Sequence, residues 1–303
     1  MIPATPLEPA PEGLGGGRPV YLKREDVHEL GAFKWRGALP TLEAWARDGS
    51  DTVVTASTGN QGAATAWAAR QLDMQAIVYV PEGAAQTKVG LIERLGAEVR
   101  TVGRDIDEAK DAARGAAGDE ELPFFEDGAE PAQYEGYRGI ARELLEQAPE
   151  PPGAVVVPLG NGALLGGIGL ELRERSPSTL SIGVQSKEAP VMVECWRAGS
   201  VVESDRCATF ADGLAVRVAI PSAVDVLAEV TSEMLLVSER AIAEAVGAYA
   251  TAGIRVEGAA AAALAALPQL DAVEDPIVLI VTGRNIDDAL WQRAVEQPAS
   301  FPD

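Results

Sequence analysis

The segment TVVTASTGNQGAATAWAARQL, residues 52–72, determines the class of fold that we predict for this chain. It opens with a β-branched run over 52–56, turns through polar and glycine residues at 57–59, and continues over 60–72 with alanines at helical spacing. β-Branched residues favour strands and alanine favours helices. The segment therefore predicts a strand, a tight turn and a helix in direct succession.

The same order recurs along most of the chain, because short apolar runs bounded by Gly or Pro alternate with helical stretches. Further strands are expected at 76–80, 97–102, 154–157, 181–184, 234–237 and 277–281, and further helices at 87–95, 105–117 and 259–267. Such alternation is typical of parallel sheets covered by crossover helices. Since 303 residues are too many for one small core, we predict an α/β fold of two domains. Each domain is expected to be an open, twisted, mostly parallel sheet covered by helices.

The composition limits the partners and the chemistry. A net charge of −21 would repel nucleic acid and anionic membranes, so we expect neither as a partner. The acid excess fits a salt-adapted, acidic proteome, and it fits an ordinary solvated surface as well. Two cysteines, no long apolar run and no signal-peptide pattern at the start favour a cytoplasmic protein. The single histidine, His28, excludes a multi-histidine zinc site.

Lys34 is the first candidate for chemistry. It stands in the run Gly31-Ala32-Phe33-Lys34-Trp35-Arg36-Gly37-Ala38, shortly after Lys23-Arg24-Glu25-Asp26. A lysine between two aromatic residues is costly to bury with its charge, so its amine becomes nucleophilic and condenses with an aldehyde. Taken alone, the run fits an ordinary surface lysine near a helix start as well.

Three further segments directly follow predicted strands, where ligands bind in parallel α/β sheets. Residues 57–62 offer hydroxyls and backbone amides, which suit a carboxylate or a phosphate at a helix N-terminus. Residues 160–167 are glycine-rich, which lets the backbone approach a phosphate closely. They match neither a Walker loop nor a ribose-binding dehydrogenase fingerprint. The third segment, 282–285, begins with a hydroxyl that could face a ligand or cap a helix.

The order and spacing of these four segments resemble the fold type II pyridoxal phosphate (PLP) enzymes, the tryptophan synthase β-like superfamily. Within it, the chain is most similar to the serine/threonine dehydratase and threonine synthase group. The resemblance runs from Thr5-Pro6-Leu7 to Asn285, and the most specific matches are residues 33–38 and 57–60.

The resemblance implies pyridoxal 5'-phosphate as cofactor and a small amino acid as substrate. Lys34 is implied as the Schiff-base lysine and, with Thr58, as a catalytic residue. The implied cofactor-binding residues are Phe33, Lys34, Asn60, Gly160, Asn161, Gly162, Ala163, Leu164 and Thr282. The implied substrate-binding residues are Ser57, Thr58, Gly59, Asn60 and Gln61. The resemblance places the neutral hydroxyl of Thr282 at the pyridine nitrogen, which favours elimination over transamination. Lys34, once released from the cofactor, would act as general base.

The expected organisation is a large PLP-binding domain at 1–36 and 130–303, with a small domain at 37–129. The Pro/Gly-rich start, residues 3–19, is expected to lie as an arm across the surface. We expect the protein to form a homodimer.

The family pattern divides between two activities. Residues 33–38, 212–216 and 283–287 resemble dehydratases. Residues 57–60, 183–186 and 215–218 followed by Pro221 resemble threonine synthases. We predict a lyase that eliminates the β-hydroxyl of L-threonine or L-serine through an aminoacrylate-type intermediate, giving a 2-oxo acid and ammonia. Threonine synthase acting on O-phosphohomoserine is the alternative. A third hypothesis, from a different functional class, is a binding protein without catalytic activity that takes an amino acid or PLP.

No metal site is predicted. The racemase-like cation site of this group uses a Glu and an Asp after the strand that ends near Val184, and here those positions are Gln185 and Val191. Chelators should therefore leave activity unchanged. Turnover with and without EDTA tests this, and a loss that magnesium restores would contradict it.

Overall fold

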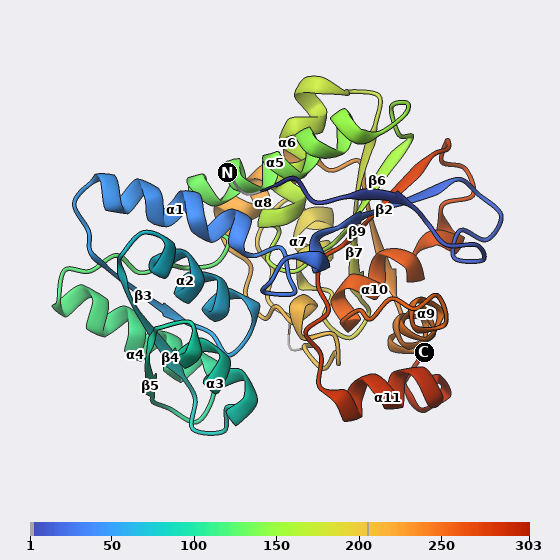
Figure 1. The fold of residues 1–303 in the computed structure, drawn as a ribbon. Coiled ribbons are helices and arrows are strands. Elements are labelled where there is room, and N and C mark those ends of the chain that lie inside the picture. The colour runs from blue at the N-terminus through green and yellow to red at the C-terminus, as the bar shows by residue number, and fades with distance from the viewer. Residues whose placement is uncertain (1–2, 205) are drawn as a thin grey trace. The chain divides into compact units, whose positions relative to one another are not determined.

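The computed structural model describes residues 3–204 and 206–303, which form two compact units (Figure 1). The small unit is continuous and runs from Phe33 to Gly136. The large unit comprises the chain up to Ala32 together with Tyr137–Asp303. The small unit therefore includes residues 33–36 and 130–136, which the expected boundaries had assigned to the large domain.

The large unit contains a six-stranded sheet in the order β1-β2-β9-β6-β7-β8. The strands are β1 (Leu7–Pro9), β2 (Val20–Arg24), β6 (Ala154–Pro158), β7 (Leu180–Ser186), β8 (Glu233–Val237) and β9 (Ile277–Val281). All neighbours pair in parallel except β1 and β2. β6 and β9 are buried along their whole length, as expected for the central strands of a sheet covered on both faces.

Helices cover this sheet, and the alanine-rich α10 is the most deeply buried of them. The helices of the large unit are α6 (Ala163–Arg175), α7 (Val191–Ala198), α8 (Pro221–Val230), α9 (Glu239–Thr251), α10 (Gly258–Ala265) and α11 (Asp288–Glu296), with short 3₁₀ turns η1 (Glu25–Val27), η2 (Asp212–Leu214), η3 (Leu267–Gln269) and η4 (Pro298–Ser300). α5 (Pro131–Gln147) begins in the small unit and ends in the large one. Residues 258–264 of α10 are all buried, since alanine and glycine let a helix approach its neighbours closely.

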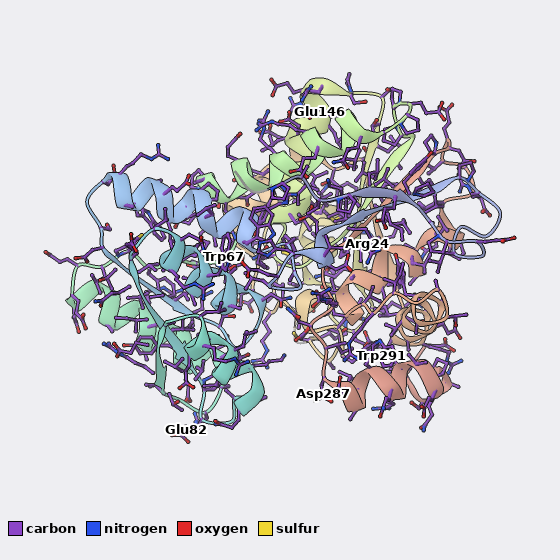
Figure 2. The ribbon with its side chains drawn as sticks, in the orientation of Figure 1. Arg24, Trp67, Glu82, Glu146, Asp287 and Trp291 are labelled. Carbon is purple, nitrogen blue, oxygen red and sulfur yellow. The ribbon has the colours of Figure 1, made fainter. Side chains whose placement is uncertain are left out.

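The small unit is a three-stranded parallel sheet, β3-β4-β5, with four helices of its own. Its elements are β3 (Thr52–Ala56), β4 (Gln75–Val80), β5 (Glu98–Thr101), α1 (Trp35–Arg47), α2 (Asn60–Gln71), α3 (Gln86–Arg94) and α4 (Ile106–Asp119). In α4 the buried residues Ala109, Ala113 and Ala117 recur every four positions and pack against strand side chains. Trp67 of α2, labelled in Figure 2, meets the ring of Trp35 edge-on with centroids 6.1 Å apart, which joins α1 to α2.

The N-terminal segment differs from the expected surface arm. Residues 7–9 form an antiparallel edge strand on β2, and Thr5 is buried. The reason lies in Lys23, whose side chain is completely buried and needs oxygen partners for its ammonium group. The Nζ atom of Lys23 donates to the carbonyl of Thr5 at 2.6 Å and to Glu143 Oε2 at 2.7 Å. The start of the chain thus forms the edge strand of the large sheet, and Thr5 is the buried residue that precedes it.

Among the described residues, no helix is both long and apolar enough to cross a membrane.

Tyr249 of α9 provides a test of the core. Its side chain is fully buried, and its hydroxyl has no hydrogen-bond partner among the described residues. Burial raises the pKa of this phenol, and the negative charge of Asp26 adds to the effect. Tyr249→Phe should therefore stabilise the protein, by about 1 kcal/mol, because it removes a buried unsatisfied hydroxyl.

Tyr134→Phe is the control, since that hydroxyl donates to Gly128 O at 3.0 Å and its removal should destabilise the protein. Thermal unfolding midpoints measure both changes, and a clear loss in Tyr249→Phe would contradict the expectation.

Candidate active site

The predicted site residues are distributed over both units. Phe33, Lys34 and the turn at 57–61 belong to the small unit, while the loop at 160–164 and Thr282 belong to the large unit. Each set lies at the carboxyl end of a parallel strand or at the start of a helix, where ligands of α/β proteins bind.

Lys34 immediately precedes α1 and already has helical backbone angles. Its Nζ atom forms an ion pair with Asp127 Oδ2 and lies 5.2 Å from the ring centre of Phe33. The lysine side chain is 17% exposed and that of Asp127 is 25% exposed, so the pair is partly shielded from water. The aromatic neighbours in the sequence predicted a desolvated amine, whereas the structure gives the amine a carboxylate partner.

Sequence reasoning missed Asp127, and the structure shows how it is held. Its Oδ1 atom accepts a hydrogen bond from Gln133 Nε2 at 2.5 Å, and Gln133 Oε1 accepts one from the backbone N–H of Gly128 at 2.7 Å. Tyr134 donates to the carbonyl of Gly128, and burial together with the charge of Asp127 raises the pKa of Tyr134 to about 12. The sequence did offer one signal for Asp127, since it closely follows the apolar pair at 124–125. Phe124 of that pair forms a single β-bridge to Val54 of β3.

The 57–61 turn connects β3 to α2. The N-cap of α2 is Gly59, with no side-chain cap, so the first helical turn keeps N–H groups that can meet an anion. Ser57 Oγ accepts from the N–H of Gly59 at 3.1 Å. Gln61 is 6% exposed, and neither end of its amide has a hydrogen-bond partner in the described part of the chain. A buried amide of this kind is available for a polar ligand.

The 160–164 loop connects β6 to α6 and is tightly packed. A Cβ atom on Gly160 would lie 2.5 Å from the carbonyl oxygen of Gly213, so only glycine fits there. Gly162 has a φ of +97° and precedes α6 without a side-chain cap of its own. The N–H of Ala163 donates to Asn161 Oδ1 at 3.2 Å, which orders the loop. The loop therefore brings bare backbone to a helix N-terminus, as a phosphate requires.

Thr282 follows the last residue of β9 and is only 2% exposed. Its hydroxyl has no hydrogen-bond partner among the residues that the structure describes. Next to it, a Cβ on Gly283 would lie 2.8 Å from the carboxylate of Glu257, which leaves no room for a larger residue. A buried hydroxyl with a free donor suits the pyridine nitrogen of PLP, and the 160–164 loop suits its phosphate. The residues present thus fit the cofactor.

The fold and these residues define the class of protein, an α/β enzyme of two units that works with PLP. The chain belongs to the pyridoxal-phosphate-dependent enzyme family, whose model matches residues 1–283. This confirms the family, the fold class and the cofactor predicted from the sequence.

Curated relatives and solved structures agree with this assignment. The chain is 34% identical over 275 residues to the L-threonine ammonia-lyase of Geobacter sulfurreducens, covering 89% of this chain and 68% of that one. It is 30% identical over 284 residues to the L-threonine ammonia-lyase of Thermotoga maritima, covering 93% and 71%. The processed form of threonine deaminase isoform 2 from Solanum lycopersicum superposes with a TM-score of 0.92 at 28% identity, covering 99% and 89%.

The end of β7 has a structural role in this chain. Gln185 is fully buried, and its Oε1 accepts the backbone N–H groups of Met192 and Val193, both at 3.2 Å. Gln185 thus caps α7, which begins at Val191. Among the described residues, no three His, Cys, Asp or Glu side chains gather as metal ligands would. The chelator experiment remains the test.

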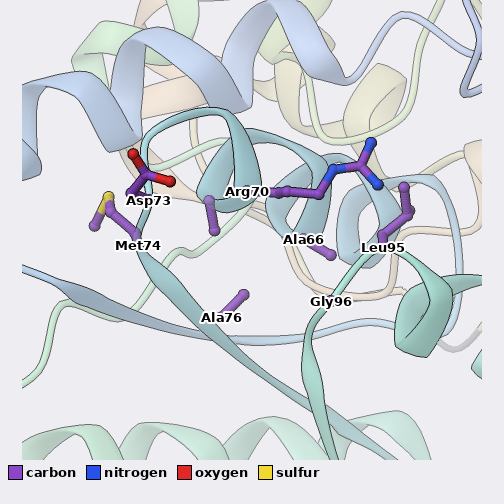
Figure 3. A pocket seen from close by; sticks show the side chains of 8 residues that line it. Ala66, Arg70, Asp73, Met74, Ala76, Leu95 and Gly96 are labelled. Atoms are coloured by element: carbon purple, nitrogen blue, oxygen red, sulfur yellow. The ribbon is translucent and has the colours of Figure 1, made fainter.

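A separate pocket of about 260 Å³ lies in the small unit (Figure 3). Its lining consists of Ala66, Ala69, Arg70, Asp73, Met74, Ala76, Leu95 and Gly96. None of these is a predicted site residue, so the pocket is distinct from the 57–61 turn.

Gly162 provides a test of the loop. Gly162→Ala would place a Cβ at positive φ and 2.8 Å from Leu227 Cδ1, so the loop must shift. We expect the dissociation constant for PLP to rise about tenfold. Titration of the cofactor-free chain, followed by visible absorbance, measures it.

Gly199→Ala is the matched control, because Gly199 also has a positive φ, of +66°, but no neighbour within 4 Å of the added Cβ. Its affinity for PLP should stay unchanged. Equal losses in the two variants would show that the 160–164 loop has no special role.

Proposed function

We propose that this chain is a lyase that eliminates the β-hydroxyl of L-threonine or L-serine, giving a 2-oxo acid and ammonia. Two L-threonine ammonia-lyases are 34% and 30% identical to it over most of its length. The structural observation that carries the proposal is the buried, unpartnered hydroxyl of Thr282. A neutral partner at the pyridine nitrogen leaves that nitrogen unprotonated, which favours elimination.

Lys34 is proposed to hold the cofactor through its amine. When bound, the cofactor withdraws electrons from the substrate α-carbon. A released Lys34 amine accepts the α-proton at Nζ, and the hydroxyl of Thr58 is the second group that can move a proton.

The N–H groups of the 57–61 turn bind the substrate carboxylate, and the buried Gln61 amide can meet a polar atom of the substrate. Phe33 lies beside the amine and Asn60 opens α2, and both are proposed to contact the cofactor.

The loop at 160–164 is proposed to bind the cofactor phosphate. The backbone N–H groups of residues 160–162 are proposed to contact this phosphate. The helix that follows begins with Ala163 and Leu164, and its N-terminus favours an anion. The homodimer and the cytoplasmic location stay predictions.

An assay of the purified protein with L-serine, L-threonine and O-phosphohomoserine tests the proposal. We expect oxo acid from serine or threonine to exceed phosphate released from O-phosphohomoserine. A phosphorylated substrate carries about two more negative charges and needs cationic donors. Arg284, which is exposed after Gly283, is the candidate donor in that case. Phosphate release that Arg284→Ala abolishes, with no oxo acid formed, would identify a threonine synthase instead.

Lys34→Ala should abolish turnover, and borohydride reduction of the parent protein should attach the pyridoxyl group to Lys34. The matched control is Lys187→Ala, because Lys187 is an exposed lysine in the other unit. Peptide mapping that finds the pyridoxyl group on Lys23 or Lys88 would overturn the assignment.

A further inference from the structure

The last residues of the chain, 300–303, lie against the segment 210–214 of the large unit. That segment in turn packs on the glycine loop at 160–164. We propose that Phe301 is a positioning residue, which fixes the backbone of this loop and thereby the binding of the cofactor phosphate. The inference rests on the proposed role of the 160–164 loop. Phe301 acts through Phe210, and it requires no contact with the cofactor.

The segment 210–214 meets the glycine loop through backbone atoms. A Cβ atom on Gly160 would lie 2.5 Å from the carbonyl oxygen of Gly213, so the two backbones touch without a side chain between them. Ala211 and Leu214, which flank this contact in the sequence, are both buried. Because no flexible side chain can absorb a shift of Gly213, the position of Gly160 depends on where the segment stands.

Phe210 begins this segment, and its backbone and its ring are both held. Its N–H donates to Glu239 Oε2 at 2.8 Å, and the other oxygen of Glu239 accepts a hydrogen bond from Ser186 at the end of β7. The ring contacts the start of α10, since a Cβ on Gly258 would lie 2.9 Å from Phe210 Cε2. Phe301, which is 4% exposed, covers this half-buried ring, and the two ring centres are 4.5 Å apart.

Phe301 is held through its ring and through both flanking residues. The guanidinium carbon of Arg293 lies 4.3 Å from its ring centre. Arg293 also donates to the carbonyl oxygen and to the hydroxyl oxygen of Ser300, both at 3.0 Å. The N–H of Arg240 donates to the carbonyl of Pro302 at 2.8 Å, next to the C-terminus that Figure 1 shows beside α9. The start of α9 therefore holds the last residues of the chain in place.

These contacts have a consequence for the cofactor. A loop that binds phosphate through backbone N–H groups binds best when those groups are already in position. Removal of the Phe301 ring leaves a cavity beside Phe210, and neighbouring groups move partly into such a cavity. The segment 210–214 would then shift, and Gly160 with it. The loss should be confined to the phosphate, because the aldehyde end of the cofactor is held by Lys34.

The test is titration of the cofactor-free, full-length chain with PLP and, separately, with pyridoxal, which lacks the phosphate. Visible absorbance gives a dissociation constant for each. Phe301→Ala should raise the dissociation constant for PLP on the order of tenfold, and that for pyridoxal should stay within about twofold. Phe301→Leu, which keeps most of the apolar volume, should recover most of the affinity for PLP.

Circular dichroism checks that each variant is folded. If Phe301→Ala is not, Arg293→Ala replaces it, because Arg293 is exposed and its loss leaves the core intact. That variant frees one side of the Phe301 ring and should weaken PLP about threefold, again without an effect on pyridoxal.

Leu144→Ala is the matched control, since it also empties a fully buried site of the large unit, on α5. It should leave the ratio of the two dissociation constants at the value of the parent protein. Equal rises for PLP and pyridoxal in Phe301→Ala would show general loosening of the unit and overturn the inference. An unchanged dissociation constant for PLP in that variant would overturn it as well.

The parent protein separates this failure from failure of the proposed function. If it binds PLP no more tightly than pyridoxal, the 160–164 loop does not bind the phosphate, and both proposals fail there. If it prefers PLP and Phe301→Ala keeps the whole preference, the role of Phe301 alone is removed.

Discussion

Strand β9 holds the large sheet together, because it pairs with β2 on one side and with β6 on the other. Its five apolar residues are all buried, so its backbone must satisfy its hydrogen bonds within the sheet. A segment near the C-terminus thereby joins the first strands of the chain to the glycine loop after β6. Thr282 stands at the end of this central strand, where the surrounding core limits its movement.

The residues proposed for the site offer two kinds of electrostatic environment, one in each unit. In the small unit, the amine of Lys34 has a charged partner whose orientation depends on the buried Gln133. In the large unit, the side chain at the end of β9 is a neutral hydroxyl, and the 160–164 loop offers backbone dipoles. In the proposed function, the lysine holds the cofactor, the 160–164 loop binds its phosphate, and the neutral hydroxyl leaves its ring nitrogen unprotonated.

Local patterns in the sequence predicted the strands β3 to β9, because strand periodicity depends on residues close together in the chain. The strand at 277–281 and the helix after residue 60 are found as predicted. Asp127 was missed because it lies 93 residues from Lys34 and no local pattern marks the contact. The edge strand β1 was missed for a related reason, since the burial of Lys23 that draws Thr5 inward depends on Glu143, far along the chain. Periodicity can be recognised within a short stretch of sequence, whereas the pairing of charges far apart in the chain cannot.

The small unit is one uninterrupted stretch, whereas the large unit is split around it. In the order of synthesis, every strand of the small sheet precedes β6, β7, β8 and β9. The first thirty residues must wait for β9, so β2 spends most of translation without its central neighbour. β1 can pair with one edge of β2 early, but the other edge stays open until β9 is made, and an open strand edge is a template for aggregation. Chaperone dependence of the nascent chain should therefore concentrate on its N-terminal strands.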